Sequence, residues 1–244
     1  MFVSGHKSDR GLIREINEDS FYINDKAGVY VVADGMGGYE GGEMASSIAA
    51  SKLGELISAS LGDVQIKDIQ TIVKIALYEA NNELIQLKKE VVKLMKMGTT
   101  VVLSVFFGKV FYYSNLGDSR AYLYNKEDDL VQLTTDDSLV MEMAKRGVIR
   151  KDQLRTHPLR NIVTRYLGAD ELVFPDLLNH KVRTGDCVML CTDGLTNMLD
   201  DAHISRLFES GISMGPQYVC NNLIDEANKS GGLDNISVII IQNK

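Results

Sequence analysis

Four aspartates stand beside apolar segments that predict β-strands, each next to residues typical of tight turns. They are Asp34 in VYVVADG, Asp118 in NLGDSR, Asp193 in VMLCTDG and Asp234 in GGLDNIS. Any one of them fits ordinary turn chemistry, in which Asp and Gly are common. Together they indicate more, because carboxylates that converge at the ends of rigid strands repel one another unless a cation lies between them. Since the candidate ligands are oxygens and not His or Cys, the pattern favours a hard ion, Mg²⁺ or Mn²⁺.

The segment REINED near the N-terminus adds a cation and two acids, Arg14, Glu18 and Asp19. Arg14 and Glu18 are four residues apart, so they could form an ordinary surface ion pair of little energetic value. An arginine beside carboxylate-bound metals is also what phosphate recognition requires, because a guanidinium binds phosphate oxygens through two parallel hydrogen bonds. From these residues alone, both interpretations stay open.

Five glycines lie close together in the segment GMGGYEGGE, residues 35–43. The segment fails the dinucleotide-binding pattern at Glu40, where glycine is required, and the P-loop pattern at Glu43, where lysine is required. It therefore predicts a glycine-rich turn that leads into a helix. Small residues there would let the backbone approach a metal, with the Gly35 carbonyl as a ligand, and would leave a cleft for a phosphorylated substrate.

Regular elements must position these residues, and the hydrophobic pattern predicts them. β-branched and aromatic segments predict strands at 21–24, 29–33, four in a meander between 99 and 134, 187–192 and 235–241. Apolar residues spaced by three or four predict helices at 43–61, 66–95, 139–146, 202–209 and 216–229. Because strands and helices occur in separate blocks, we expect an α+β fold with helices packed on antiparallel sheets.

Length and composition limit the architecture and the partners. The chain has 244 residues, three prolines and no evident linker, so we expect one domain over residues 1–244. A formal charge of −7 argues against a nucleic-acid surface, which needs clustered Lys and Arg. No signal peptide or membrane-spanning run is evident, so we expect a cytoplasmic protein without membrane contact. Cys187, Cys191 and Cys220 form no CxxC pair, and buried free thiols explain them better than zinc ligands.

As a set, RxxNED, ADGMGG, GDSR, TDG and GGLDNISV resemble the motifs of metal-dependent type-2C serine/threonine protein phosphatases in their compact bacterial form. The resemblance extends from Asp9 to Ile241. It implies a central sandwich of two antiparallel β-sheets flanked by pairs of antiparallel α-helices, with two Mn²⁺ or Mg²⁺ ions at one end. A flap segment at about 135–180 would lie beside the ions.

The resemblance also implies the ligands of each ion. Asp34 would bridge both ions. Asp193 and Asp234 would hold the first ion, whereas Glu18 and the Gly35 carbonyl would hold the second. Two ions about 3.5 to 4 Å apart can share a water, lower its pKa toward neutrality and direct it at phosphorus without a covalent phosphoenzyme.

Three further residues complete the implied site. Asp19 would orient metal-bound water, and Asp118 would form a third, weaker metal site together with Asp193. Arg14 would bind the phosphate and neutralise its equatorial oxygens. We therefore expect Arg14, Asp34, Asp193 and Asp234 to carry catalysis.

Two positions depart from the family pattern. Met36 stands where many eukaryotic relatives have a histidine proposed as general acid, although bacterial members commonly have methionine there. Asp137, in DDS, stands where histidine is usual, which affects the expected geometry of the flap. The flap also carries seven basic residues against one acid between Lys145 and Arg165. Such a run is usually a solvated face; our hypothesis is that it steers phosphoprotein substrates toward the metals.

We therefore expect a monomeric phosphatase that hydrolyses phosphoserine and phosphothreonine in proteins and opposes a cognate protein kinase in bacterial signalling. An inactive phosphopeptide-binding module on the same fold is one alternative. The complete set of carboxylates argues against it, because a binding module has no chemical need for a metal site. Hydrolysis of small phosphoesters is a second alternative, which competition by phosphopeptides against a small substrate would test.

Overall fold

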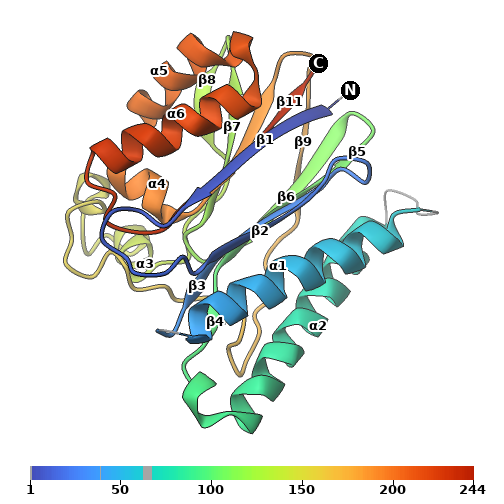
Figure 1. Ribbon diagram of the computed structural model, residues 1–244, viewed down its shortest axis with the longest axis vertical. Coiled ribbons are helices and arrows are strands. Elements are labelled where there is room, and N and C mark those ends of the chain that lie inside the picture. The colour runs from blue at the N-terminus through green and yellow to red at the C-terminus, as the bar shows by residue number, and fades with distance from the viewer. Residues whose placement is uncertain (1, 39, 63–67) are drawn as a thin grey trace.

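The computed structural model describes residues 2–38, 40–62 and 68–244, and Figure 1 shows two stacked antiparallel sheets with helices on their outer faces. The β1 sheet contains, in spatial order, β1 (Phe2–Asp9), β11 (Ile236–Asn243), β10 (Cys187–Cys191), β7 (Arg120–Asn125) and β8 (Asp129–Gln132). The β2 sheet contains β2 (Asp19–Asn24), β3 (Val29–Met36), β5 (Val101–Phe107), β6 (Val110–Leu116) and β9 (Leu178–Lys181), with β4 (Gly98–Thr99) paired to the end of β3. The predicted α+β sandwich is confirmed.

The interface between the two sheets is an apolar core. Tyr30 and Val32 of β3 meet Val188 of β10 and Ile239 of β11 there, and none of the four has exposed surface. Their chain neighbours point to the opposite face of each strand, toward the helices. The uninterrupted apolar runs of the sequence follow from this burial on both faces.

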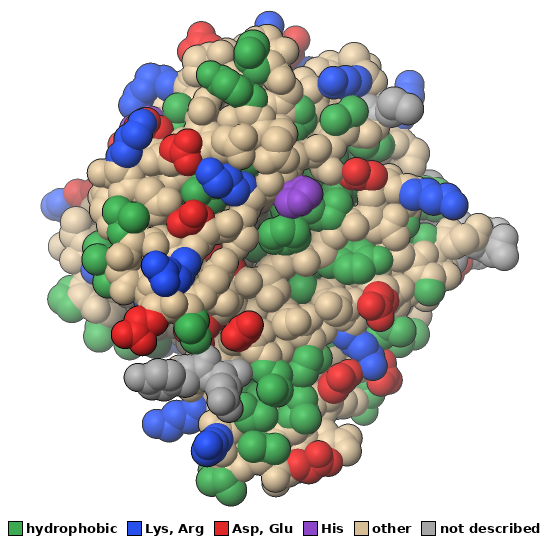
Figure 2. Space-filling view, in the orientation of Figure 1, with side chains coloured by type: hydrophobic (Ala, Val, Ile, Leu, Met, Phe, Trp, Pro, Cys, Tyr) green, Lys and Arg blue, Asp and Glu red, His purple; other side chains and the backbone are tan. Residues whose placement is uncertain are grey.

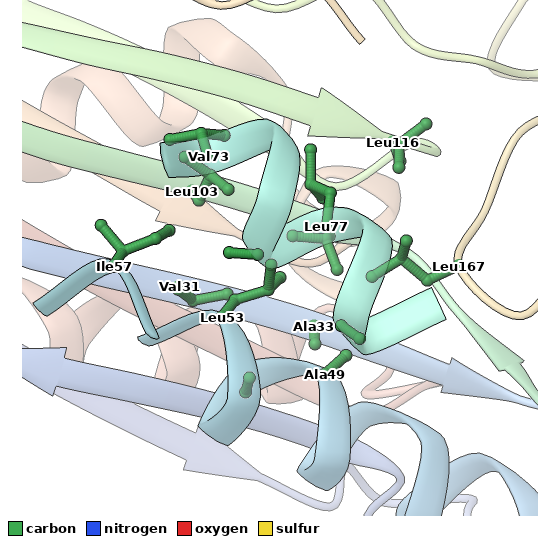
Figure 3. Close-up of a cluster of buried hydrophobic side chains, with 14 of the residues drawn as sticks. Val31, Ala33, Ala49, Leu53, Ile57, Val73, Leu77, Leu103, Leu116 and Leu167 are labelled. Carbon is green, nitrogen blue, oxygen red and sulfur yellow. The ribbon is translucent and has the colours of Figure 1, made fainter. Parts of the chain in front are cut away.

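Two long helices, α1 (Glu40–Ser60) and α2 (Ile69–Glu90), cover the outer face of the β2 sheet (Figure 1). Figure 3 shows Leu53 of α1 and Leu77 of α2 packed near Val31 of β3. Burying a leucine side chain completely stabilises the fold by about 1.5–3 kcal/mol. The apolar stripe of each helix therefore fixes it on the sheet, and with it the glycine-rich turn that precedes α1.

Three shorter helices cover the β1 sheet: α4 (Asp193–Met198), α5 (Asp201–Gly211) and α6 (Pro216–Lys229). Phe208 of α5 stacks on Tyr124 of β7 with ring centroids 4.8 Å apart. The three cysteines are buried and unpaired in this layer, as the sequence predicts. Within the described residues, no helix is both long and apolar enough to cross a bilayer.

The four strands predicted as one meander belong to different sheets, so that prediction was wrong in part. β5 and β6 form a hairpin in the β2 sheet, whereas β7 and β8 form one in the β1 sheet. The chain crosses between the sheets at Gly117, whose φ of 103° favours glycine. The same turn residues occur in a hairpin within one sheet and in a connection between two sheets. The sequence pattern therefore could not distinguish the two cases. The crossing places Asp118 where both sheets end.

The boundaries of several elements differ from the predicted ones. The second long helix ends at Glu90, not near 95, and is followed by a 3₁₀ turn at Val92–Leu94. Its predicted start at about 66 lies outside the described residues. β1 had no signal of its own because FVSGHKSD is largely polar. It becomes a strand by pairing with β11 along its full length.

The flap contains the short helix that the sequence predicts, α3 (Leu139–Lys145). Ser138 caps its N-terminus by accepting a hydrogen bond from the backbone N–H of Met141 at 3.3 Å. Gly147 follows the helix with φ 72°, the left-handed conformation that ends many helices. Much of the remaining segment to His180 is irregular.

Candidate metal and phosphate site

A pocket of about 250 Å³ opens at the end of the sandwich where β3 ends and α4 begins. Seven of the eight predicted site residues line it: Arg14, Glu18, Asp34, Gly35, Asp118, Asp193 and Asp234. Met36 lines it as well. The sequence thus predicted most of one pocket from residues that are up to 220 positions apart.

Asp19, the eighth predicted residue, is buried and does not line the pocket. It lies opposite Asp34 in the register of β2 and β3. Its Oδ2 accepts a hydrogen bond from the hydroxyl of Thr192 at 2.9 Å, and that hydroxyl accepts one from the backbone N–H of Ser237 at 3.0 Å. Asp19 is therefore oriented from the β1 sheet and fixed behind the pocket.

The glycine-rich turn allows three backbone segments to come into contact. A Cβ on Gly35 would lie 2.1 Å from the carbonyl oxygen of Gly42, and a Cβ on Gly42 would lie 2.2 Å from Glu18 Oε1. The backbone N–H of Gly35 also donates to the Glu18 carbonyl at 3.1 Å. Any larger residue at either glycine would push the start of α1 away from β3 or displace the Glu18 carboxylate. This close approach is the structural reason for glycine after Asp34.

Asp118 and Asp193 enter the pocket from the two sheets. Asp118 directly follows Gly117 at the crossing point. Asp193 begins α4 one residue after Thr192, and Asn197 Nδ2 donates to Asp193 Oδ2 at 2.9 Å. Both carboxylates are thus held by short, rigid connections at the ends of strands, which is how accurately placed ligands are usually supported.

Arg14 and Asp234 come from opposite ends of the chain and form an ion pair. The Nη2 atom of Arg14 lies 2.8 Å from Asp234 Oδ2. Asn235 supports both loops, because its Nδ2 donates to the carbonyls of Arg10 and Ile16 and its Oδ1 accepts from the backbone N–H of Glu18. Arg14 is therefore held at the pocket edge, paired with a pocket carboxylate and not with Glu18 as a surface pair.

Burial, reinforced by repulsion between neighbours, raises the pKa values of Asp34, Asp118 and Asp193 in the pocket and of Asp19 behind it. Burial is the largest cause in each case. The pKa of Asp193 rises to about 6, that of Asp19 to about 7 and that of Asp118 to about 8, while that of Asp34 rises well above its ordinary value. Nearby aspartates add to the shift, as Asp193 does for Asp118. Such shifts mean that the site disfavours a full set of bare negative charges.

The donor chemistry of the pocket fits hard divalent cations. Its lining offers carboxylate oxygens, with no His or Cys among the described residues that form it. Glu18 Oε1 and Asp19 Oδ1 are buried and lack a hydrogen-bond partner, a costly state that a cation would relieve. No group of three or more described His, Cys, Asp or Glu side chains has ligand geometry already.

The flap closes one side of the pocket with Asn161 and Val163. A smaller pocket of about 50 Å³ adjoins it under the flap and shares Asp118 and Asp193 with it. There Arg120 binds Asp136 through two hydrogen bonds, Nε to Oδ1 at 2.8 Å and Nη2 to Oδ2 at 2.7 Å. Asp136 is thus already neutralised by a cation.

The charge of the flap is smaller than its sequence indicates. Of its basic residues, Arg146, Arg150 and Arg165 form ion pairs with acids. Arg155 instead donates to the carbonyl of Leu199 at 3.4 Å. Steering of phosphoproteins by this segment stays a hypothesis.

Known proteins resemble the chain over nearly all its length. The model of the protein phosphatase 2C family matches residues 14–223. The chain belongs to the protein phosphatase 2C family. It is 35% identical to the serine/threonine phosphatase stp of Listeria innocua over 97% of this chain and 94% of that protein.

Solved structures of the protein phosphatase 2C type have the same fold. The Mycobacterium tuberculosis serine/threonine phosphatase PstP/Ppp matches with a TM-score of 0.90 and 31% identity, covering 100% of this chain and 99% of that one. The catalytic domain of PstP, solved in complex with 2 manganese ions, matches with a TM-score of 0.86 and 30% identity over 99% and 97%. The resemblance deduced from the motifs is thereby confirmed.

Several supporting residues of this protein phosphatase 2C site were missed from the sequence. Thr192 and Asn235 hold Asp19 and the Arg14 loop, and Asn161 and Val163 reach the pocket from the flap. Thr192 and Asn235 each adjoin a predicted aspartate, so a search of the neighbours of candidate ligands could have found them. No pattern in the sequence singles out Asn161 or Val163, because their position depends on how the flap folds back.

Proposed function

We propose that the chain is a metal-dependent phosphatase that hydrolyses phosphoserine and phosphothreonine in proteins, with residues 1–244 as one catalytic domain. The observation that carries the proposal is the convergence of Arg14 with five carboxylates in one pocket, where their mutual repulsion calls for cations. Mn²⁺ or Mg²⁺ bound there would supply an acidified water as nucleophile and an electrostatic clamp on the phosphate.

The metal ligands that we propose are those the pocket offers. Asp34 has four acidic neighbours. After burial, the charges of Asp19, Asp193, Asp118 and Asp234 further raise its pKa. It is therefore the candidate for the bridging ligand. Asp193 and Asp234 would complete one metal position. Glu18 and the Gly35 carbonyl would form the other, with a third, weaker position at Asp118.

Arg14 would bind the substrate phosphate. One Nη donates to Asp234 while the side chain stays 48% exposed, so other N–H groups of the guanidinium can reach phosphate oxygens. Charge develops on these oxygens in the transition state, and a fixed guanidinium stabilises it there. Arg14 is therefore expected to act on the chemical step and on binding.

Asp19 would orient the attacking water. Its Oδ2 is occupied by Thr192, whereas its Oδ1 has no hydrogen-bond partner. Burial, the largest cause, raises its pKa to about 7. The hydrogen bond from Thr192 to Oδ2 leaves Oδ1 as the oxygen available for this role.

The direct test is hydrolysis of an aryl phosphate and of a phosphothreonine peptide with Mn²⁺, with EDTA, and by Asp34→Asn and Asp193→Asn. Activity should require Mn²⁺ and be lost in both variants while their circular dichroism stays native. Asp225→Asn is the matched control, because Asp225 pairs with Lys7 on the surface, away from the pocket. A folded wild type that binds Mn²⁺ and turns over neither substrate would contradict the proposal.

The biological setting is also a proposal. The relatives that carry phosphatase names are bacterial, which supports a role in bacterial signalling opposite a cognate protein kinase. Three buried, unpaired cysteines are compatible with a reducing compartment such as the cytoplasm. A monomeric state is part of the same proposal. Sedimentation would test the monomeric state. Pull-down of the phosphatase from its own cells would test for a cognate protein kinase.

A further inference from the structure

Five large aliphatic side chains are exposed beside the metal and phosphate pocket. Leu12, Ile13 and Leu233 are 63%, 65% and 54% exposed, and Leu159 and Ile162 are 40% and 43% exposed. We call these five residues the apolar rim. A single exposed leucine is normal on a protein surface and needs no explanation. Five such residues beside one pocket do require an explanation.

Three rim residues are chain neighbours of residues that line the pocket. Ile13 precedes Arg14, Leu233 precedes Asp234, and Ile162 separates Asn161 from Val163. Figure 1 shows the blue loop after β1 and the red loop before β11 together at the left end of the molecule, next to the yellow flap. The rim therefore adjoins the place where a substrate phosphate would bind.

The backbone under the N-terminal part of the rim is firmly held. The N–H of Leu12 donates to the carbonyl of Gly232 at 2.8 Å, which joins the two loops. Gly232 has φ 51°, and a Cβ there would lie 2.8 Å from Leu12 Cγ, so the contact requires glycine. Asn235 holds the same loop through the carbonyl of Arg10 at 2.9 Å. These side chains are exposed on an ordered loop.

The flap part of the rim is held in the same way. The carbonyl of Ile162 accepts a hydrogen bond from the N–H of Leu139 at the start of α3, at 2.8 Å. The N–H of Ile162 donates to the carbonyl of Leu159 at 3.2 Å. Ser138 pairs with Val163 as an isolated bridge. The two apolar side chains are thus placed by the fold of the flap.

We propose that the apolar rim binds aliphatic side chains that flank the phosphorylated residue of a protein substrate. The proposal rests on the proposed phosphatase function and names the substrate class of the same site. Phosphate alone needs the metals and Arg14 but gains nothing from exposed leucine or isoleucine. A phosphorylated serine or threonine in an extended peptide carries its neighbours out of the pocket and across the rim. Because the rim backbone is already ordered, binding costs this loop little extra backbone conformational entropy.

Paired phosphothreonine peptides test the proposal. One peptide carries leucine and isoleucine on both sides of the phosphothreonine, and the other carries serine at those positions with the same length and charge. We expect the wild type to show a KM about three- to tenfold lower for the aliphatic peptide, the range expected for partial burial of one or two such side chains. An equal KM for the two peptides would overturn the proposal.

Rim variants locate the effect. Leu12→Ser, Leu233→Ser and Ile162→Ser should each reduce the preference between the two peptides, with kcat on the serine peptide as internal reference. Val92→Ser and Met214→Ser are matched controls, since these apolar residues are 79% and 70% exposed away from the pocket, and they should keep the preference. If the rim variants keep the full preference for the aliphatic peptide, that preference arises from another part of the surface and the proposal is overturned. If the wild-type protein hydrolyses neither peptide and no aryl phosphate, the result would instead contradict the phosphatase function.

Discussion

Arg165 donates a hydrogen bond to Asp137 across the base of the flap, with Nη1 3.1 Å from Oδ1. The other oxygen of Asp137 accepts from the backbone N–H of Gly117 at 3.2 Å, and Arg165 Nη2 also donates to the carbonyls of Val173 and Phe174. The residue that replaces the usual histidine thus joins both arms of the flap to the crossing point before Asp118. Asp137, which departs from the family pattern in the sequence, is therefore paired with Arg165 in the structure.

Breaking this pair should loosen the flap. Burial raises the pKa of Asp137 and Arg165 opposes the rise, so the pair is a partly desolvated one. A double-mutant cycle of Asp137→Asn and Arg165→Met should give a coupling of about 1 kcal/mol in chemical denaturation. The exposed pair Arg150–Asp152 is the control, and its coupling should be close to zero despite its 2.6 Å distance. Equal couplings for the two pairs would contradict this account.

Replacing Arg14 should slow catalysis without unfolding the protein. Arg14→Ala is expected to lower kcat/KM by about a hundredfold, the usual effect of removing one donor to a developing negative charge. Arg14→Lys should recover only part of this, because an ammonium cannot form two parallel hydrogen bonds. Arg10→Ala serves as the control, since Arg10 contacts the Glu15 carbonyl in the same loop. Inhibition by inorganic phosphate, measured alongside, should weaken only in the Arg14 variants.

Gly42→Ala should damage the site more than the fold. The new methyl group would lie 2.2 Å from Glu18 Oε1, the movable end of that side chain, and 3.1 Å from the backbone carbonyl carbon of Gly35, which would need to shift only slightly. Alanine also favours the helix by about 1 kcal/mol over glycine, which offsets part of the strain. We expect a nearly unchanged melting temperature together with weaker Mn²⁺ binding in calorimetry. Gly62→Ala, where an added methyl group meets nothing within 4 Å, should change neither.

In EDTA, the protein should lose stability as pH rises. A carboxyl whose pKa is raised in the folded state binds more protons there than in the unfolded state. Stability therefore falls between the ordinary value of 3.8 and the folded value, which is about 6 for Asp193 and about 8 for Asp118. We expect a lower melting temperature at about pH 8.5 than at about pH 5.5, and a smaller difference in Asp118→Asn. A melting temperature that rises over this interval would show that the acids are not destabilising.

Excess Mn²⁺ should remove that loss of stability at the higher pH. A cation that binds the deprotonated carboxylates stabilises the folded state by mass action and releases protons on binding. The measurement is the same melting experiment with Mn²⁺ in place of EDTA, with Asp193→Asn as the variant that should respond least. Identical curves with Mn²⁺ and EDTA at high pH would argue against a cation site among these acids.

The sequence predicted the carboxylates that line the pocket because the signals for them are local in the chain. Asp34 and Asp193 each stand beside a strand and a glycine, so motif and element could be read together. The supports were harder to find: Asn235 acts through the carbonyls of Arg10 and Ile16, which are distant in the chain. β1 was missed for the same reason, since its strand character comes from β11 and not from its own side chains. Local sequence patterns do not reveal pairing between segments that are distant in the chain.

The pairing of β1 with β11 also sets the order in which the pocket can be built during synthesis. Arg14, Glu18 and Asp34 leave the ribosome well before Asp234 and the strand that pairs with β1. A nascent chain without β11 can form the hairpin of β2 and β3 and still have neither the ion pair of Arg14 nor the support of Asn235. The chain must therefore be synthesised through β11 before the pocket is complete, which postpones activity until that strand has emerged.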